Sequence, residues 1–189
     1  MDRAVSLFVL NNLHSKFLTP IMLFVSKITH AGLFWIALNL IFLILAVIKY
    51  KKLSVAVAVS LVTLLVGWLI NDKVLKNVFE RPRPFVVIEE IRLFMESIGY
   101  TSSGYSFPSG HSFSSMEQAI ILTGINKKAG YFTIPFAVIV GFSRIYLGAH
   151  YLTDVIAGLI LGLLFGLLAN FVIKKLKNNE KLKSVKWLL

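Results

Sequence analysis

The sequence predicts an all-α integral membrane protein, a polytopic helical bundle of about six transmembrane helices. Hydrophobic residues make up 57% of the 189 residues, with a mean hydropathy of +0.77, whereas a soluble domain is usually about 45–50% apolar. Long apolar stretches recur along the chain. At this length we expect one domain over residues 1–189. The chain has no cysteine, which excludes disulfides, thiolate metal sites and a cysteine nucleophile.

Six apolar segments account for the predicted bundle, and they cover residues 4–29, 31–48, 53–71, 110–124, 131–148 and 152–173. A helix needs about 20 residues to cross a bilayer, and the second, third, fifth and sixth segments approach or reach that length. The fourth is short, and we expect it to begin inside a protein-lined cavity. Polar residues interrupt the first, which suits an interfacial helix running into a short span; whether it crosses fully is left open.

The net charge of +11 can indicate either a surface that binds nucleic acid or a set of lysines held on the cytoplasmic side of a membrane. If all six segments cross, 13 of the 20 basic residues fall on one side, including those of a basic tail over residues 174–189. The positive-inside rule then places that tail in the cytoplasm. We therefore expect a multi-pass protein of the cell (inner, cytoplasmic) membrane, with no nucleic-acid partner and with an extracytoplasmic loop over residues 84–108.

A first polar group on the predicted outer side is KNVFERPRP, residues 76–84. Lys76 and Arg83 are seven residues apart, nearly two helical turns, so both side chains can point the same way. Pro82 and Pro84 end the helix and stiffen its exit. Taken alone, the stretch is equally compatible with a basic cap on a membrane helix.

A second polar group is FPSGHS, residues 107–112, which combines turn residues with the start of a helix. Backbone N–H groups at a helix N-terminus form an anion site. Ser109 adds a hydroxyl, Gly110 a backbone N–H, and His111 a side chain that exchanges protons near neutral pH. An ordinary helix cap with an incidental histidine is the alternative.

The third polar group is SRIYLGAHYLTD, residues 143–154. Arg144 lies near the end of a span, where a charge is costly unless it faces a cavity or a partner. His150 and Asp154 are four residues apart and share a helix face, and a carboxylate beside an imidazole suits a histidine nucleophile or base. A surface pair without chemistry is the alternative. The same helix face continues with three small residues, Gly158, Gly162 and Gly166. Such residues favour close helix packing, either inside the bundle or in a dimer, so the sequence leaves the oligomeric state open.

Together these groups resemble the three-part signature of the type 2 phosphatidic acid phosphatase family, which vanadium-dependent haloperoxidases share. The matching pieces are Lys76-x6-Arg83-Pro84, Pro108-Ser109-Gly110-His111 and Ser143-Arg144-x5-His150-x3-Asp154. The resemblance implies a metal-independent lipid phosphatase without a cofactor. It implies that His150 attacks phosphorus, Asp154 orients it, and His111 protonates the leaving oxygen. It also assigns five residues to the phosphoryl oxygens: Lys76, Arg83, Ser109, Gly110 and Arg144.

A site at the outer membrane face suits a lipid phosphate or diphosphate drawn from the bilayer. A polyprenyl diphosphate such as undecaprenyl diphosphate is the first expectation, and phosphatidylglycerophosphate, phosphatidic acid and lipid A 1-phosphate are alternatives. A non-enzymatic lipid transporter or binding protein is a different class, which has no need of a nucleophile and an acid. A haloperoxidase-like vanadate enzyme is disfavoured by the predicted spans.

Two further features lie beside these motifs in the sequence. Residues 86–99 carry an apolar stripe on one helical face, which suits an interfacial helix that flanks or lids lipid entry, or a plain connecting helix. Lys73 and Arg81 lie beside the first motif but off its spacing. We therefore expect their replacement to be far milder than replacement of His111 or His150.

Overall fold

A computed structural model describes residues 1–48 and 54–179 of the chain, and those residues form helices joined by loops. The helices are α1 (Asp2–Leu13), α2 (Leu18–Ile28), the 3₁₀ helix η1 (His30–Gly32), α3 (Leu33–Ile48), α4 (Ser54–Trp68), the π-helix η3 (Leu69–Leu75), α5 (Lys76–Phe79), α6 (Pro84–Val87), α7 (Glu89–Ser97), α8 (Gly110–Ile125), α9 (Lys127–Tyr146) and α10 (Leu152–Lys177). The all-α prediction is confirmed.

Within the described ranges, three helical stretches are long and apolar enough to cross a membrane: Ser54–Val87, Lys127–Tyr146 and Leu152–Lys177. The pair α2 and α3 meets at 55° and makes a fourth span if the two are counted together. The central helix α8, with 16 residues, is short, as its apolar segment predicted. A membrane-spanning helical protein is thus confirmed, whereas six crossings remain a prediction.

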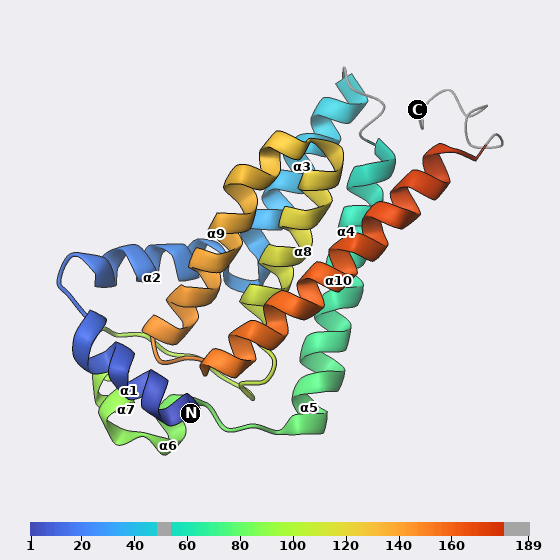
Figure 1. Ribbon diagram of the computed structural model, residues 1–189. Coiled ribbons are helices and arrows are strands. Elements are labelled where there is room, and N and C mark those ends of the chain that lie inside the picture. Colours follow the sequence, from blue (N-terminus) through green and yellow to red (C-terminus); the bar gives the residue numbers. More distant parts are fainter. Residues whose placement is uncertain (49–53, 180–189) are drawn as a thin grey trace.

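The first apolar segment, residues 4–29, is divided between α1 and α2 and does not form one continuous helix. The break follows from its polar residues. The Ser15 hydroxyl accepts the Leu18 backbone N–H, and the His14 ring stacks on Phe94 at 3.8 Å. Figure 1 shows α1 beside α6 and α7 at one end of the bundle, with α2 running crosswise to the long helices.

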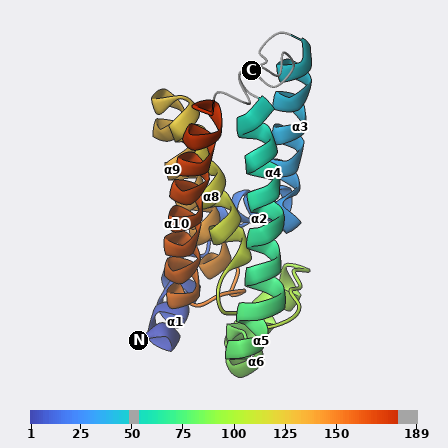
Figure 2. The ribbon, with the colours of Figure 1, turned by 90° about the vertical axis from the view of Figure 1, so that its right-hand side faces the viewer.

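Helix α8 lies at the centre and packs against α9, α10 and α4 (Figure 2). The predicted small-residue face of α10 makes this contact within the chain. A Cβ atom at Gly162 would lie 2.3 Å from the Phe113 carbonyl oxygen, and one at Gly158 would lie 2.5 Å from the Ser109 carbonyl oxygen. Glycine therefore allows the backbones of α8 and α10 to approach closely where the site begins.

Buried hydrogen bonds hold α3 and α4 against α8. The Trp35 indole donates to the Ser115 hydroxyl at 3.1 Å. The Gln118 carbonyl oxygen accepts from the Asn39 amide at 2.9 Å and from the Ser60 hydroxyl at 2.7 Å. Such polar pairs between helices supply the directional attraction that apolar surface does not supply in lipid.

The apolar stripe predicted over residues 86–99 is the packed face of α7. Ile91 and Met95 are buried and contact Tyr151, Leu7 and Leu10, so α7 lies between α1 and the loop before α10. In this position α7 covers the outside of the loop that carries His150. Its role as a lid stays a prediction.

One end of the bundle carries a group of lysines. Lys174, Lys175 and Lys177 lie in the last turn of α10, at the end opposite to α1, α6 and α7 (Figure 1). The remainder of the predicted basic tail, residues 180–189, lies outside the described residues, as do residues 49–53.

Candidate active site

The three predicted motifs meet at one cavity of about 1100 Å³. Six of the eight predicted site residues line it: Lys76, Arg83, Gly110, His111, Arg144 and His150. The other two, Ser109 and Asp154, are fully buried behind its wall. Residues separated by more than 70 positions along the chain thus share one polar chamber.

His150 lies in the short loop between α9 and α10, so the prediction that it shares a helix face with Asp154 is wrong: Asp154 is in the first turn of α10, and His150 precedes that helix. The Arg144 carbonyl oxygen accepts from the Ala149 and His150 backbone N–H groups, at 3.0 Å and 3.2 Å, which folds the loop back onto the end of α9. Gly148 adopts a φ of +69°, and a side chain there would collide with Ile91 of α7. This tight turn places the His150 ring, only 2% exposed, against the cavity.

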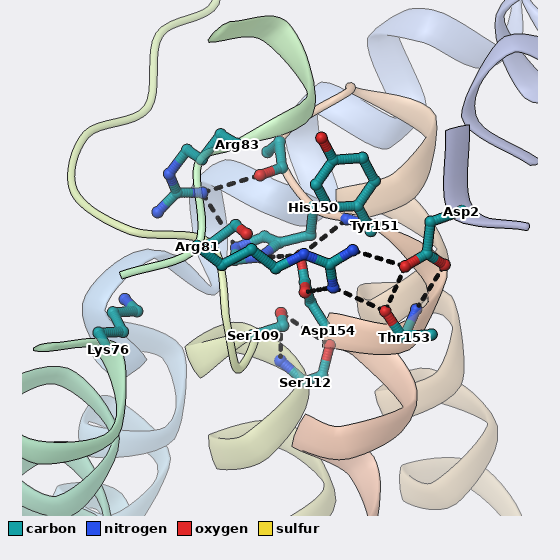
Figure 3. Close-up of polar contacts among 12 residues, drawn as sticks. Asp2, Lys76, Arg81, Arg83, Ser109, Ser112, His150, Tyr151, Thr153 and Asp154 are labelled. Carbon is teal, nitrogen blue, oxygen red and sulfur yellow. Dashed lines mark hydrogen bonds and ion pairs between the residues drawn. The ribbon is translucent and has the colours of Figure 1, made fainter. Parts of the chain in front are cut away.

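Arg83 holds this loop and the ring of His150 together. Its guanidinium donates to the carbonyl oxygens of Gly104 and Ser103, both at 2.8 Å, and of Ala149 at 2.9 Å. Its Nη1 also lies 3.1 Å from His150 Nε2 (Figure 3). Because a guanidinium only donates, Nε2 is the acceptor and the ring proton is assigned to Nδ1. The lone pair that a nucleophile needs is therefore on Nε2.

Asp154 faces the other nitrogen of the same ring. Its Oδ2 lies 3.6 Å from His150 Nδ1, within ion-pair range but longer than a hydrogen bond. That oxygen also accepts the Tyr151 backbone N–H at 2.8 Å, which caps the start of α10. A carboxylate in this position favours the Nδ1–H tautomer and stabilises the charge that the ring gains during attack.

The surroundings of His150 keep its ring neutral. His150 lies outside the membrane-spanning helices, and burial together with the charges of Arg83, Arg144 and Lys76 holds its pKa well below the usual range. Burial disfavours a charged ring, and nearby cations disfavour it further. The same cations that suit a phosphate therefore keep Nε2 unprotonated.

A network that the sequence did not predict supports Asp154 from behind. Arg81 donates to Asp154 Oδ1 at 2.6 Å, to the Thr153 hydroxyl at 2.7 Å and to Asp2 Oδ2 at 2.6 Å. Asp2 also bonds Thr153, and the Arg81 guanidinium stacks over the Tyr151 ring at 4.1 Å (Figure 3). Arg81 thus ties α1 and α10 together at the expected catalytic carboxylate.

The second motif begins α8 beside this network. The Ser109 backbone N–H donates to the Asp154 carbonyl oxygen at 3.0 Å, which joins the second motif to the third. The Ser109 hydroxyl accepts from the Ser112 hydroxyl at 2.9 Å and caps the helix. Its side chain therefore serves the fold in this state, and its contact with a phosphate stays a prediction. His111 lines the cavity, and its Nε2 has no hydrogen-bond partner among the described residues.

Two further cations face the cavity with partners of their own. Lys76 pairs with Asp72, one turn earlier, in the π-helical segment η3; π-helical turns frequently mark functional sites. Arg144 donates to the hydroxyls of Ser26 and Tyr100. With Arg83, these cations make the chamber suited to a compact anion with several oxygens.

Away from the cations, the same cavity is apolar. It continues between α3 and α4, where its lining includes Leu33, Ile36, Leu61, Leu64, Leu65 and Trp68. A cavity that is cationic at one end and apolar at the other suits an amphiphile with an anionic head. Phosphoryl transfer requires mainly positioning and charge stabilisation, and the chamber offers both beside a neutral imidazole.

Residues 51–177 match the family model described as the PAP2 superfamily. The chain is 29% identical over 155 residues to undecaprenyl-diphosphatase BcrC of Bacillus subtilis, covering 82% of this chain and 75% of that protein. It is 31% identical to an undecaprenyl-diphosphatase of Sulfolobus acidocaldarius, over 84% of this chain and 72% of the relative. A crystal structure of a transmembrane PAP2-type phosphatidylglycerolphosphate phosphatase from Bacillus subtilis superimposes with a TM-score of 0.74 at 27% identity, covering 94% of this chain and 86% of that one. The chain therefore belongs to the PAP2 superfamily, as its three motifs predicted, and is a membrane lipid phosphatase.

Proposed function

We propose that this phosphatase hydrolyses a polyprenyl diphosphate, such as undecaprenyl diphosphate, to the lipid monophosphate and inorganic phosphate without a metal ion. The observation that carries the proposal is the single cavity that joins Arg83, Arg144 and Lys76 to an apolar passage between α3 and α4. The names of the relatives from Bacillus subtilis and Sulfolobus acidocaldarius support the diphosphate.

The proposed reaction has two steps at His150. In the first, Nε2 attacks the terminal phosphorus, the bond from that phosphorus to the bridging oxygen breaks, and His111 gives a proton to the departing lipid monophosphate. In the second, His111 takes a proton from water, the water oxygen attacks the phosphohistidine, and the P–N bond breaks to release phosphate. Arg83, Arg144 and Lys76 stabilise the phosphoryl oxygens in both steps.

A lipid monophosphate is the second candidate substrate. The superimposable Bacillus subtilis structure is named for phosphatidylglycerolphosphate, and phosphatidic acid and lipid A 1-phosphate present the same phosphoryl group. The cations and histidines described above serve a phosphate monoester equally well. The two candidates differ only in what is attached to the leaving oxygen.

The experiment is phosphate release by the purified protein in detergent, measured on these lipids with EDTA present. We expect activity in EDTA, and a loss of about 10²–10⁴-fold for His111→Ala, the range of a positioned general acid. His150→Ala should lose at least as much, because no covalent intermediate can form. Lys73→Ala is the matched control, since this exposed lysine adjoins the first motif and faces the Trp68 ring.

Two outcomes would contradict the proposal. Loss of activity in EDTA would exclude the metal-independent mechanism. Absence of phosphate release from every lipid, with lipid binding unaffected by His150→Ala, would favour the non-enzymatic transporter or binding protein.

We also propose that the site faces the extracytoplasmic side of the cell membrane, that five of the apolar segments cross the bilayer, and that the first, residues 4–29, enters it at the site end, where Asp2 bonds Thr153. The lysines in the last turn of α10 support this orientation, because they lie at the opposite end from the site. The chain has no cysteine, so single-cysteine variants are direct probes. Glu96→Cys should react with an impermeant maleimide on intact cells, and Asn178→Cys only after lysis; the reverse pattern would invert the topology.

A further inference from the structure

Two basic side chains line the active-site cavity but belong to none of the three motifs. His30 begins η1, and its ring centroid lies 6.0 Å from that of His111. Lys27 lies in the last turn of α2. Both line the same cavity as His150 and Arg83. The position of His30 next to His111 matters, because His111 is the residue expected at the leaving oxygen.

The segment that carries His30 and Lys27 is docked on the site. Ser26, the residue before Lys27, is buried and accepts a hydrogen bond from Arg144. Thr29 is fully buried, and its hydroxyl donates to the Val25 carbonyl oxygen at 2.8 Å. The backbone that carries His30 and Lys27 is therefore bonded to Arg144, a residue predicted to bind the phosphate. Among the described residues the His30 ring has no hydrogen-bond partner, and His30 is exposed.

The in-line geometry of phosphoryl transfer predicts which atom of the substrate lies near His111. The attacking and leaving atoms are roughly in line on opposite sides of the phosphorus. With His150 as the nucleophile and His111 at the leaving oxygen, the next atom of the substrate lies on the His111 side. In a lipid monophosphate that atom is carbon, and in a lipid diphosphate it is the second phosphorus with its anionic oxygens.

We propose that His30 and Lys27 form a second phosphate subsite that binds the lipid-linked phosphate of a diphosphate substrate. This inference rests on the proposed function and deepens it, because it names the residues that distinguish a diphosphate from a monophosphate. A neutral imidazole has one N–H donor in either tautomer, and an ammonium has three. A site that hydrogen-bonds a substrate group disfavours the analogue that lacks the group.

The test compares two substrates with the same tail, farnesyl diphosphate and farnesyl monophosphate. In His30→Ala, kcat/KM for the diphosphate should fall about 10- to 100-fold, the range for losing one hydrogen bond to a charged group. The value for the monophosphate should change less than about 2-fold. Lys27→Ala should act in the same direction, and the double variant should lose more. His30→Gln retains an N–H donor and should recover part of the diphosphate activity.

Lys16→Ala is the matched control, because this lysine is exposed and does not line the cavity. Its two kcat/KM values should equal those of the wild type. The thermal midpoint of each variant shows whether a loss of activity comes from misfolding or from weaker binding of the diphosphate. If His30→Ala is destabilised, His30→Gln and Lys27→Ala provide the comparison instead.

Three outcomes would overturn the inference, and they separate it from the proposed function. Equal losses on both substrates would assign His30 and Lys27 a structural role. A wild-type preference for the diphosphate that survives in the double variant would exclude the subsite but leave the proposed function intact. A wild-type enzyme that cleaves the monophosphate and not the diphosphate would refute the polyprenyl diphosphate function and the subsite with it.

Discussion

Replacement of Arg81 by glutamine tests whether the network behind Asp154 positions the catalytic pair. The change removes the bond to Asp154 Oδ1, whose side chain is 0% exposed, whereas the Arg81 side chain is 29% exposed. Water can replace the lost contact only on the Arg81 side. A hydrogen bond to a charged group contributes about 1.5–3 kcal/mol, and each 1.36 kcal/mol is tenfold in rate. We therefore expect kcat to fall about 10- to 100-fold.

This loss is larger than the motif spacing alone predicts, because Arg81 lies off that spacing yet bonds Asp154 directly. The loss should still be smaller than that of His150→Ala, because Asp154 keeps its bond from the Tyr151 N–H. KM should change little, since neither Arg81 nor Asp154 lines the cavity.

The assay is steady-state phosphate release in detergent, with kcat and KM determined separately. Arg81→Lys should be intermediate, because one ammonium replaces a fork whose two nitrogens contact Asp154 and Asp2. Asp2→Asn should cost less than Arg81→Gln. Arg92→Gln is the matched control: Arg92 pairs with Glu89 at 3.0 Å, and both side chains are more than half exposed.

An Arg81→Gln enzyme as active as Arg92→Gln would contradict a positioning role for Arg81. That role would also be refuted if the loss were confined to KM, or if a lowered thermal midpoint explained all of it.

Three further predictions concern the nucleophile, the anion site and the helix packing. Because burial and neighbouring cations lower the pKa of His150, its neutral form persists as the pH falls, and the acid limb of kcat/KM should lie below the ordinary pKa of histidine; a limb at that ordinary value would contradict this. Vanadate, a mimic of pentacoordinate phosphorus, should inhibit phosphate release competitively, and an unaffected rate would argue against the phosphohistidine mechanism. Gly162→Ala places a Cβ atom 2.3 Å from the Phe113 carbonyl oxygen and should lower the thermal midpoint and the activity together. Leu164→Ala, at a side chain 55% exposed, is its control, and an equal effect in both variants would refute the packing argument.

Local sequence patterns were sufficient to predict the class of protein and most of its chamber. Apolar runs indicate helices in a membrane because a backbone in lipid must satisfy its own hydrogen bonds. The turn before His111 is a local feature that can be predicted without the fold. The predicted helical phase of Lys76 and Arg83 is wrong, because α5 ends at Phe79, Glu80 adopts a φ of +43° and Arg83 has an extended backbone. Six of the eight predicted residues line one cavity, and Asp154 lies directly behind it.

Contacts between distant segments could not be predicted in this way. The Arg81–Asp154 pair joins residues 73 positions apart and the Asp2–Thr153 pair 151 positions apart, and no local periodicity encodes either. Likewise, His30 comes to lie beside His111 only because η1 packs against α8 and α2 packs against α9. Spacing along one helix is set by its own geometry. Which helices meet, and so which distant side chains support or extend the site, is set by how their faces pack together.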